Sequence, residues 1–199
     1  MASTQTILND RTTTYATAGD FCRIFNEEMT DLYSLALMLA ADAEKAEQLF
    51  VSGLDDCASS NPVFKEWASS WARRTIVKIA VRLIAPQPGS PKHVLNTAVV
   101  SEAKSWLLPE LPAEISAVVG LSPFERFAFV LSVLEGYSDQ DSALLLGCTR
   151  QALIAARVRA EQQIARTVAI QEGGRSDNKP NNHESAIKLA VSMPLAVPA

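Results

Sequence analysis

The chain has 199 residues, of which 48% are hydrophobic and 20% are charged, and its formal net charge is −4. This balance is typical of a folded globular protein and excludes a disordered chain. The acidic net charge also excludes a protein that binds nucleic acid through overall basicity, so DNA binding would need a local basic surface or the help of a partner.

Cysteine and histidine are sparse in this sequence. The three cysteines, Cys22, Cys57 and Cys148, are widely spaced without a C-x-x-C pair, and there are two histidines. We therefore expect no metal site and no cofactor, and the pattern favours buried thiols in a reducing cytoplasm. The amino-terminal residues are polar, without the apolar core of a signal peptide. The apolar run 189–199 is short and contains two prolines, so we expect no membrane span.

Helical periodicity dominates the chain and strand signals are scarce, so the predicted fold class is all-α with two small helical domains. Three prolines interrupt any helix between the domains: Pro86, Pro88 and Pro91. The predicted organisation is a flexible N-terminal arm (1–19), a helical domain (20–84), a Pro-rich linker with one short helix (85–120), a second helical domain (121–171) and a disordered tail (172–199).

The stretch 64–84 predicts an amphipathic helix with a basic and aromatic side. A step of 100° per residue places six residues on one stripe: Phe64, Trp67, Trp71, Arg74, Lys78 and Arg82. Aromatic rings can stack on unpaired bases and cations can hold phosphates. The alternative is that Trp67 and Trp71 pack on a helix at 31–40 while the cations are merely solvated. Packing is favoured for Trp67, and DNA contact is favoured for the cations.

The stretch 121–164 predicts three helices, of which the last two form a helix-turn-helix. Ser122 and Glu125 have the spacing of a capping box at the start of the first helix. Ser138 and Thr149 can cap the next two helices, and a glycine between those helices provides the turn. An ordinary three-helix bundle with a solvated polar face is the alternative.

The last of these helices has two distinct faces. The inward face is apolar: Leu153, Ala156, Ala160 and Ile164. The outward face mixes polar and apolar residues: Gln151, Ile154, Ala155, Val158, Arg159 and Gln162. In a helix-turn-helix the outward face enters the major groove, where Gln can pair with adenine and Arg with guanine or phosphate.

Residues 121–150, L-S-P-F-E-R-F-A-F-V-L-S-V-L-E-G-Y-S-D-Q-D-S-A-L-L-L-G-C-T-R, resemble region 4 of bacterial extracytoplasmic-function sigma factors, which reads the promoter −35 element. Residues 25–82 resemble region 2 of the same family less closely, through D-L-Y-S-L-A-L-M-L (31–39), D-A-E-K-A-E-Q-L-F (42–50) and the helix at 64–82. The resemblance implies a cytoplasmic transcription-initiation protein that binds RNA polymerase core at its β′ clamp and directs it to promoter DNA. It also implies an anti-sigma factor as a further partner.

The resemblance also implies three sets of contact residues. The DNA contacts in the helix-turn-helix are Thr149, Arg150, Gln151, Ile154, Arg157, Arg159 and Gln162. The DNA contacts in the N-terminal domain are Trp67, Trp71, Arg73, Arg74, Lys78 and Arg82. The polymerase contacts are Asp42, Glu44, Glu47 and Phe50.

Two departures from the family pattern leave a second function open. The family's polymerase-docking segment, with its following basic and aromatic residues, is replaced here by V-S-G-L (51–54) and then by Asp55 and Asp56, which repel phosphates. The last helix has Ile154 and Ala156 where the family commonly has cations. The alternative is a degenerate sigma-like protein that binds an anti-sigma factor or another regulator without initiating transcription. An enzyme is disfavoured, because the sequence has no Ser/His/Asp arrangement, no phosphate-binding Gly loop and no metal cluster.

Overall fold

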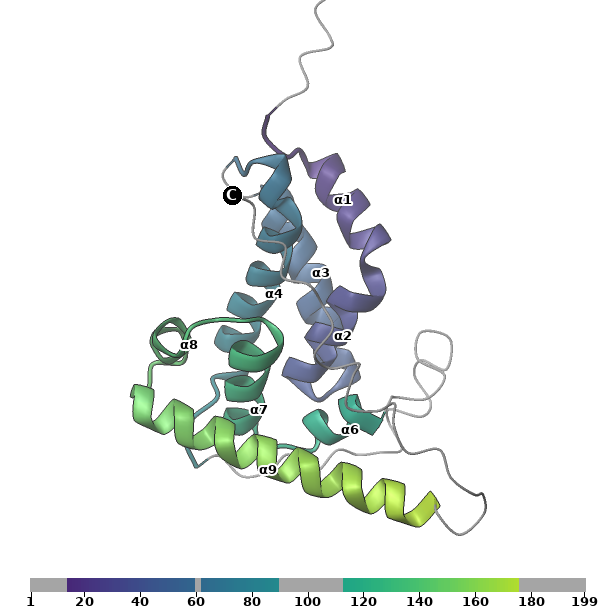
Figure 1. Ribbon diagram of the computed structural model, residues 1–199. Coiled ribbons are helices and arrows are strands. Elements are labelled where there is room, and N and C mark those ends of the chain that lie inside the picture. The colour runs from purple at the N-terminus through teal and green to yellow at the C-terminus, as the bar shows by residue number, and fades with distance from the viewer. Residues whose placement is uncertain (1–13, 60–61, 90–112, 176–199) are drawn as a thin grey trace, which may run out of the picture.

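The computed structural model describes residues 14–59, 62–89 and 113–175 (Figure 1). Within these ranges all regular secondary structure is helical, which confirms the predicted all-α class. Three parts of the predicted organisation lie outside the described residues: the first 13 residues of the arm, the linker at 90–112 and the tail from 176.

The N-terminal half of the described chain is a bundle of four helices. These are α1 (Ala18–Glu27), α2 (Met29–Ala40), α3 (Ala43–Ser59) and α4 (Ala68–Ile84), with a 3-10 turn, η1 (Lys65–Trp67), leading into α4. Figure 1 shows α4 on the left of the bundle and α1 on the right, with α3 between them. The core consists of the buried faces of these helices, including Phe21, Phe25, Leu32, Leu35, Leu39, Leu49, Ile76 and Val77.

A close approach between α3 and α4 accounts for the glycine in the V-S-G-L segment. A Cβ at Gly53 would lie 2.9 Å from Ile76 Cγ1 and 3.5 Å from Phe25 Cζ. The glycine therefore lets three helices meet in a buried layer where a larger residue would force them apart.

The C-terminal half contains the shorter helices and one long one. These are α6 (Ala113–Val119), α7 (Pro123–Phe129), a π-helical turn η2 (Val130–Leu134), α8 (Asp139–Leu146) and α9 (Arg150–Arg175). In Figure 1, α9 lies across the ends of α6 and α7. The helix α6 lies within the last part of the predicted linker, 85–120. The helix α9 extends to Arg175, so the first residues of the predicted disordered tail are helical instead.

Arg126 of α7 joins the two halves through a buried guanidinium that is 1% exposed. Its Nε donates to the Leu39 carbonyl of α2 at 3.2 Å, and its Nη1 donates to the Leu121 carbonyl at 3.2 Å. Longer bonds reach the carbonyls of Ala40 at 3.5 Å and Val119 at 3.4 Å. Carbonyls at a helix C-terminus lack partners within the helix, so Arg126 satisfies the end of α2. Burial lowers the pKa of Arg126 to about 10.

Two local predictions are wrong. Ser122 does precede Pro123 at the start of α7, but its hydroxyl donates to Glu125 Oε2 at 2.7 Å and makes no capping bond to the backbone. The expectation of buried cysteines fails for Cys22, which is exposed, whereas Cys57 is buried and Cys148 half-buried. Burial raises the pKa of the Cys57 thiol.

None of the described helices is both long enough and apolar enough to cross a membrane. The described ranges likewise hold no cluster of three or more side chains suited to a metal ion.

Candidate nucleic-acid interface

The helix-turn-helix forms as the sequence predicts. The Ser138 hydroxyl accepts the Asp141 N–H at 3.1 Å at the start of α8, and the Thr149 hydroxyl accepts the Ala152 N–H at 3.2 Å at the start of α9. Between them, Gly147 adopts φ +63°, a left-handed conformation that glycine takes without strain. These local contacts fix the angle at which α9 leaves the turn.

The two faces of α9 also match the prediction. Leu153, Ala156 and Ala160 are fully buried, and Ile164 is half-buried. The opposite face exposes Gln151, Ala155, Val158, Arg159 and Gln162, with Ile154 half-buried beside them. The α9 helix therefore exposes this face to solvent, led by Gln151 in its first turn.

Three arginines of α9 that were predicted to contact DNA are paired with carboxylates of α7 and α8. Arg157 Nη1 lies 2.5 Å from Asp139 Oδ1, and Arg150 Nη2 lies 3.8 Å from Asp139 Oδ2. Arg159 Nε lies 2.9 Å from Glu125 Oε1. A DNA phosphate would have to compete with these acids, which reduces the electrostatic contribution that the unit can make to binding.

The basic stripe of α4 is exposed. Trp67 is 59% exposed and Trp71 is 38% exposed, so packing on α2, which was favoured for Trp67, does not occur. Arg74, Lys78 and Arg82 are exposed along the same side. Aromatic and cationic side chains thus share one surface, as stacking on bases and binding of phosphates require.

A groove of about 1090 Å³ runs along this surface between α3, η1 and α4. Its lining includes Asp56, Phe64, Trp67, Trp71, Arg74 and Lys78. Trp67 is the last residue of η1, and Trp71, Arg74 and Lys78 come from α4, whereas Asp56 comes from α3 on the other side. The groove therefore combines ring faces and positive charge on one wall with a carboxylate on the other.

Arg73, also predicted to contact DNA, points elsewhere. Its Nε and Nη2 lie 3.1 and 2.5 Å from the two carboxylate oxygens of Glu135, a bidentate pair. The hydrogen bond to Glu135 raises the pKa of Arg73 further above its usual value. The pair lines a second cleft, of about 600 Å³, between α2, α4 and the turn before α8. Sequence reasoning missed this pairing because Glu135 belongs to the other half of the chain.

The four predicted polymerase contacts divide into two groups. Glu44 and Glu47 are exposed on α3. Asp42 accepts the Lys45 N–H at 2.9 Å and so caps the start of α3. Phe50 is half-buried and packs edge-on to Phe25 of the core, with ring centroids 5.1 Å apart. Of these four residues, Glu44 and Glu47 are therefore the two that the fold exposes to solvent.

The segment before α1 contributes an aromatic residue that the sequence analysis did not single out. The Ala16 N–H donates to the Val63 carbonyl at 2.6 Å, and the Lys65 N–H donates to the Thr14 carbonyl at 3.0 Å. These bonds place Tyr15 on Phe64. Residues 14–17 lie within the predicted flexible arm but are instead fixed to the turn that precedes α4.

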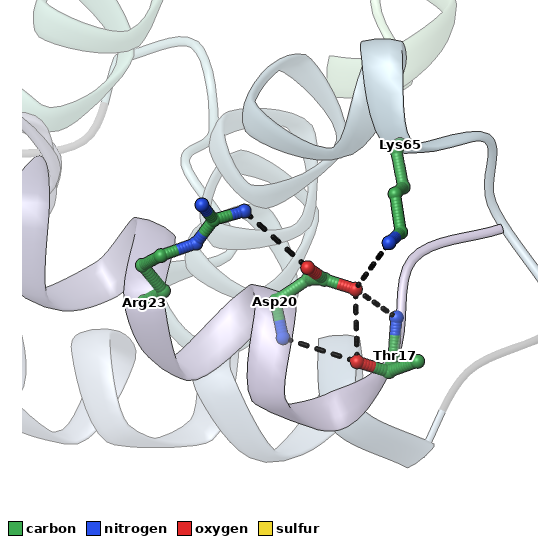
Figure 2. Close-up of polar contacts among 4 residues, drawn as sticks. All are labelled: Thr17, Asp20, Arg23 and Lys65. Carbon is green, nitrogen blue, oxygen red and sulfur yellow. Dashed lines mark hydrogen bonds and ion pairs between the residues drawn. The ribbon is translucent and has the colours of Figure 1, made fainter. Parts of the chain in front are cut away.

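Polar contacts at the start of α1 reinforce this attachment (Figure 2). The Asp20 carboxylate accepts the N–H of Thr17 at 2.9 Å and its hydroxyl at 2.8 Å, while Lys65 and Arg23 approach at 3.6 and 3.3 Å. The bond from the Thr17 N–H is the main reason that the pKa of Asp20 lies below its usual value. The ion pair with Lys65 ties α1 to η1.

Comparison with known proteins adds little to this geometry. No family model matches the chain, and no curated protein matches it. A solved structure of the sigma factor RpoE in complex with the anti-sigma factor NepR, from Bartonella quintana, is similar at 21% sequence identity and a TM-score of 0.42. The match covers 76% of this chain and 98% of that one. A TM-score this low assigns neither a function nor a partner to this chain.

Proposed function

We propose that this chain is a divergent sigma-factor-like protein that binds RNA polymerase core and directs it to promoter DNA. The observation that carries the proposal is the helix-turn-helix of α8 and α9, which has capped helix starts, a left-handed glycine turn and an exposed face on its second helix. The sequence of this unit is also the part that resembles region 4 of the sigma family most densely.

The second support is the groove on α4. In a transcription initiator, one domain must read duplex DNA and another must hold the strand that is opened. Exposed Trp67 and Trp71 beside Arg74 and Lys78 suit an unpaired strand, because ring faces stack on any base and cations follow the backbone. We assign duplex reading to Gln151 and Gln162 of α9, with Arg150, Arg157 and Arg159 supplying phosphate contacts after they leave their acidic partners.

The ion pairs on the helix-turn-helix imply weak binding to DNA by the free chain. Such weakness is acceptable in a subunit that polymerase holds at the promoter, because tethering raises the effective concentration of DNA. It would handicap a free-standing repressor. We therefore assign the polymerase-binding role to the exposed acids of α3, Glu44 and Glu47.

Reconstitution with purified core RNA polymerase tests the proposal. The wild-type chain should comigrate with core enzyme at micromolar concentration and support transcription from a promoter selected from a DNA library. Glu44→Lys should weaken comigration, whereas Glu27→Lys, at an exposed acid of α1, should not. Absence of polymerase binding at these concentrations contradicts the proposal.

A DNA-reading variant separates the two activities. Gln151→Ala should lower promoter-specific transcription by about 5- to 150-fold while leaving polymerase binding intact, since a paired base contact contributes about 1–3 kcal/mol. Asn26→Ala, at an exposed position of α1, is the matched control. Equal loss in both variants would argue against base reading by α9.

A second function is favoured by one observation, the engagement of Arg157 and Arg159 by Asp139 and Glu125. A chain whose reading cations are neutralised could bind an anti-sigma factor or another regulator without initiating transcription. This alternative predicts that affinity purification from the source cells recovers a regulator in stoichiometric amount and no polymerase. Recovery of polymerase without a regulator contradicts it.

A further inference from the structure

Three aromatic rings, those of Tyr15, Phe64 and Trp67, contact one another in sequence at one end of the groove on α4. Tyr15 stacks on Phe64, with ring centroids 4.8 Å apart and planes inclined by 27°. Phe64 in turn meets Trp67 edge-on at 5.2 Å. Phe64 and Trp67 line the groove, so Tyr15 extends its aromatic wall by one further ring.

Tyr15 is held in place but not covered. Two backbone hydrogen bonds, one on each side of Tyr15, pair its segment with residues 63–65 as an isolated antiparallel bridge. The ion pair of Lys65 with Asp20 fastens the same turn to α1. The Tyr15 side chain remains 47% exposed. A fixed, exposed ring loses little conformational entropy when it binds a planar partner, which is the property of a stacking residue.

The surroundings of the ring favour an anionic strand as its partner. Lys65 follows Phe64 in the chain and its side chain is 43% exposed. Arg74 and Lys78 continue the positive charge along the groove. Stacking faces spaced along a cationic path are the arrangement that binds single-stranded nucleic acid without reading its sequence.

We infer that Tyr15 is a base-stacking residue, and that the segment 14–17 and the start of α4 form one continuous surface for single-stranded DNA. This inference rests on the proposed function, because it extends the strand that Trp67 and Trp71 would hold. The segment 14–17 would then contact single-stranded DNA directly, in addition to the basic stripe of α4.

Photocrosslinking of the wild-type full-length chain tests the placement. The probe is a 12-nucleotide oligothymidylate carrying 5-iodouracil, used at low salt with the chain alone and with the chain bound to core RNA polymerase. Mass spectrometry should locate crosslinks on Tyr15 as well as on Trp67 or Trp71. Crosslinks on the tryptophans without any on Tyr15 overturn the inference and leave the proposed function intact. No binding of the probe in either form overturns both.

Substitution separates stacking from structural support. Tyr15→Leu should weaken binding of the same oligonucleotide by at least about fivefold, since the loss of one stacked base lowers affinity by about fivefold or more. Tyr15→Phe, which keeps the ring, should bind within about twofold of wild type. Tyr15→Leu should also leave the dependence of affinity on salt unchanged, whereas Lys78→Ala should reduce its slope by about one. Equal binding by Tyr15→Leu and wild type, or an equal loss in Tyr15→Phe, overturns the stacking role.

Discussion

Arg73 of α4 and Glu135, at the end of the π-helical turn η2, form a bidentate ion pair with N–O distances of 3.1 and 2.5 Å. The Glu135 side chain is 6% exposed and that of Arg73 is 34% exposed. The pair and the buried Arg126 both link the N-terminal helices to the C-terminal ones through polar contacts. The π turn contributes to the pair, because the Glu135 N–H bonds to the Val130 carbonyl five residues back and so ends the helix at that point.

The Arg73–Glu135 pair should be a measurable source of stability. Glu135→Ala leaves Arg73 half-buried without its main partner, so we expect the free energy of unfolding to fall by about 1–3 kcal/mol. Glu161→Ala is the matched control, because Glu161 is 49% exposed and lies 3.9 Å from Arg157 in a surface pair worth at most about 0.5 kcal/mol. Urea denaturation measures both. Equal losses in the two variants would mean that the pair adds nothing beyond a surface contact.

Arg126 should contribute more to the free energy of unfolding than an exposed arginine does. Arg126→Met keeps the length of the side chain but removes the donors to the α2 carbonyls, so we expect a loss of about 2–4 kcal/mol. Arg166→Met changes an exposed residue of α9 and should shift stability by less than about 0.5 kcal/mol. Chemical denaturation at neutral pH compares them. A loss below about 1 kcal/mol for Arg126→Met would show that water replaces the guanidinium at little cost.

Asp20 should make stability depend on pH in acid. Its folded pKa lies below the ordinary value of 3.8, so the unfolded chain binds more protons as pH falls through this range. The contribution of Asp20 is therefore fully present well above the unfolded value of 3.8 and is lost as pH drops through its folded pKa. Asp20→Asn should flatten this part of the acid dependence in thermal unfolding measured between pH 7 and pH 2.

The contacts that lower the pKa of Asp20 can be compared with one another by substitution. The bonds from Thr17 lower its pKa more than the charge of Lys65 does. Thr17→Ala removes the hydroxyl bond and should alter the acid dependence more than Lys65→Met. If Lys65→Met has the larger effect, the capping geometry in Figure 2 is not the main determinant.

Gly53 should not tolerate a methyl group. Gly53→Ala gains about 1 kcal/mol of helix propensity but places its Cβ against buried Ile76, an overpacking cost of about 1–3 kcal/mol, so we expect a net loss of stability. Gly120→Ala is the matched control, because a Cβ there would lie at ordinary contact distances of 3.5 and 3.6 Å. Thermal and urea unfolding of both variants check this. Stabilisation by Gly53→Ala would indicate that α3 and α4 separate easily.

The sequence by itself determined the helical class, the helix-turn-helix with its caps at Ser138 and Thr149, and the exposed basic stripe of α4. These features depend on contacts between residues three or four apart, whose geometry the helix repeat fixes in advance. The capping box predicted at Ser122 also involves residues three apart, yet it does not form. The Glu125 carboxylate accepts from the Ser122 hydroxyl and from Arg159 instead.

Only the tertiary structure decided which charged and aromatic side chains pair with distant segments of the chain. Arg73 finds Glu135 at a separation of 62 residues, and Arg126 reaches Leu39 at a separation of 87. Tyr15 reaches Phe64 through an equally non-local bridge. Helical periodicity states which face a residue occupies but not which distant segment covers that face. The packing of the helices determines the partner of each buried polar group. A buried polar group must be hydrogen-bonded, and only the fold determines which donor or acceptor lies close enough.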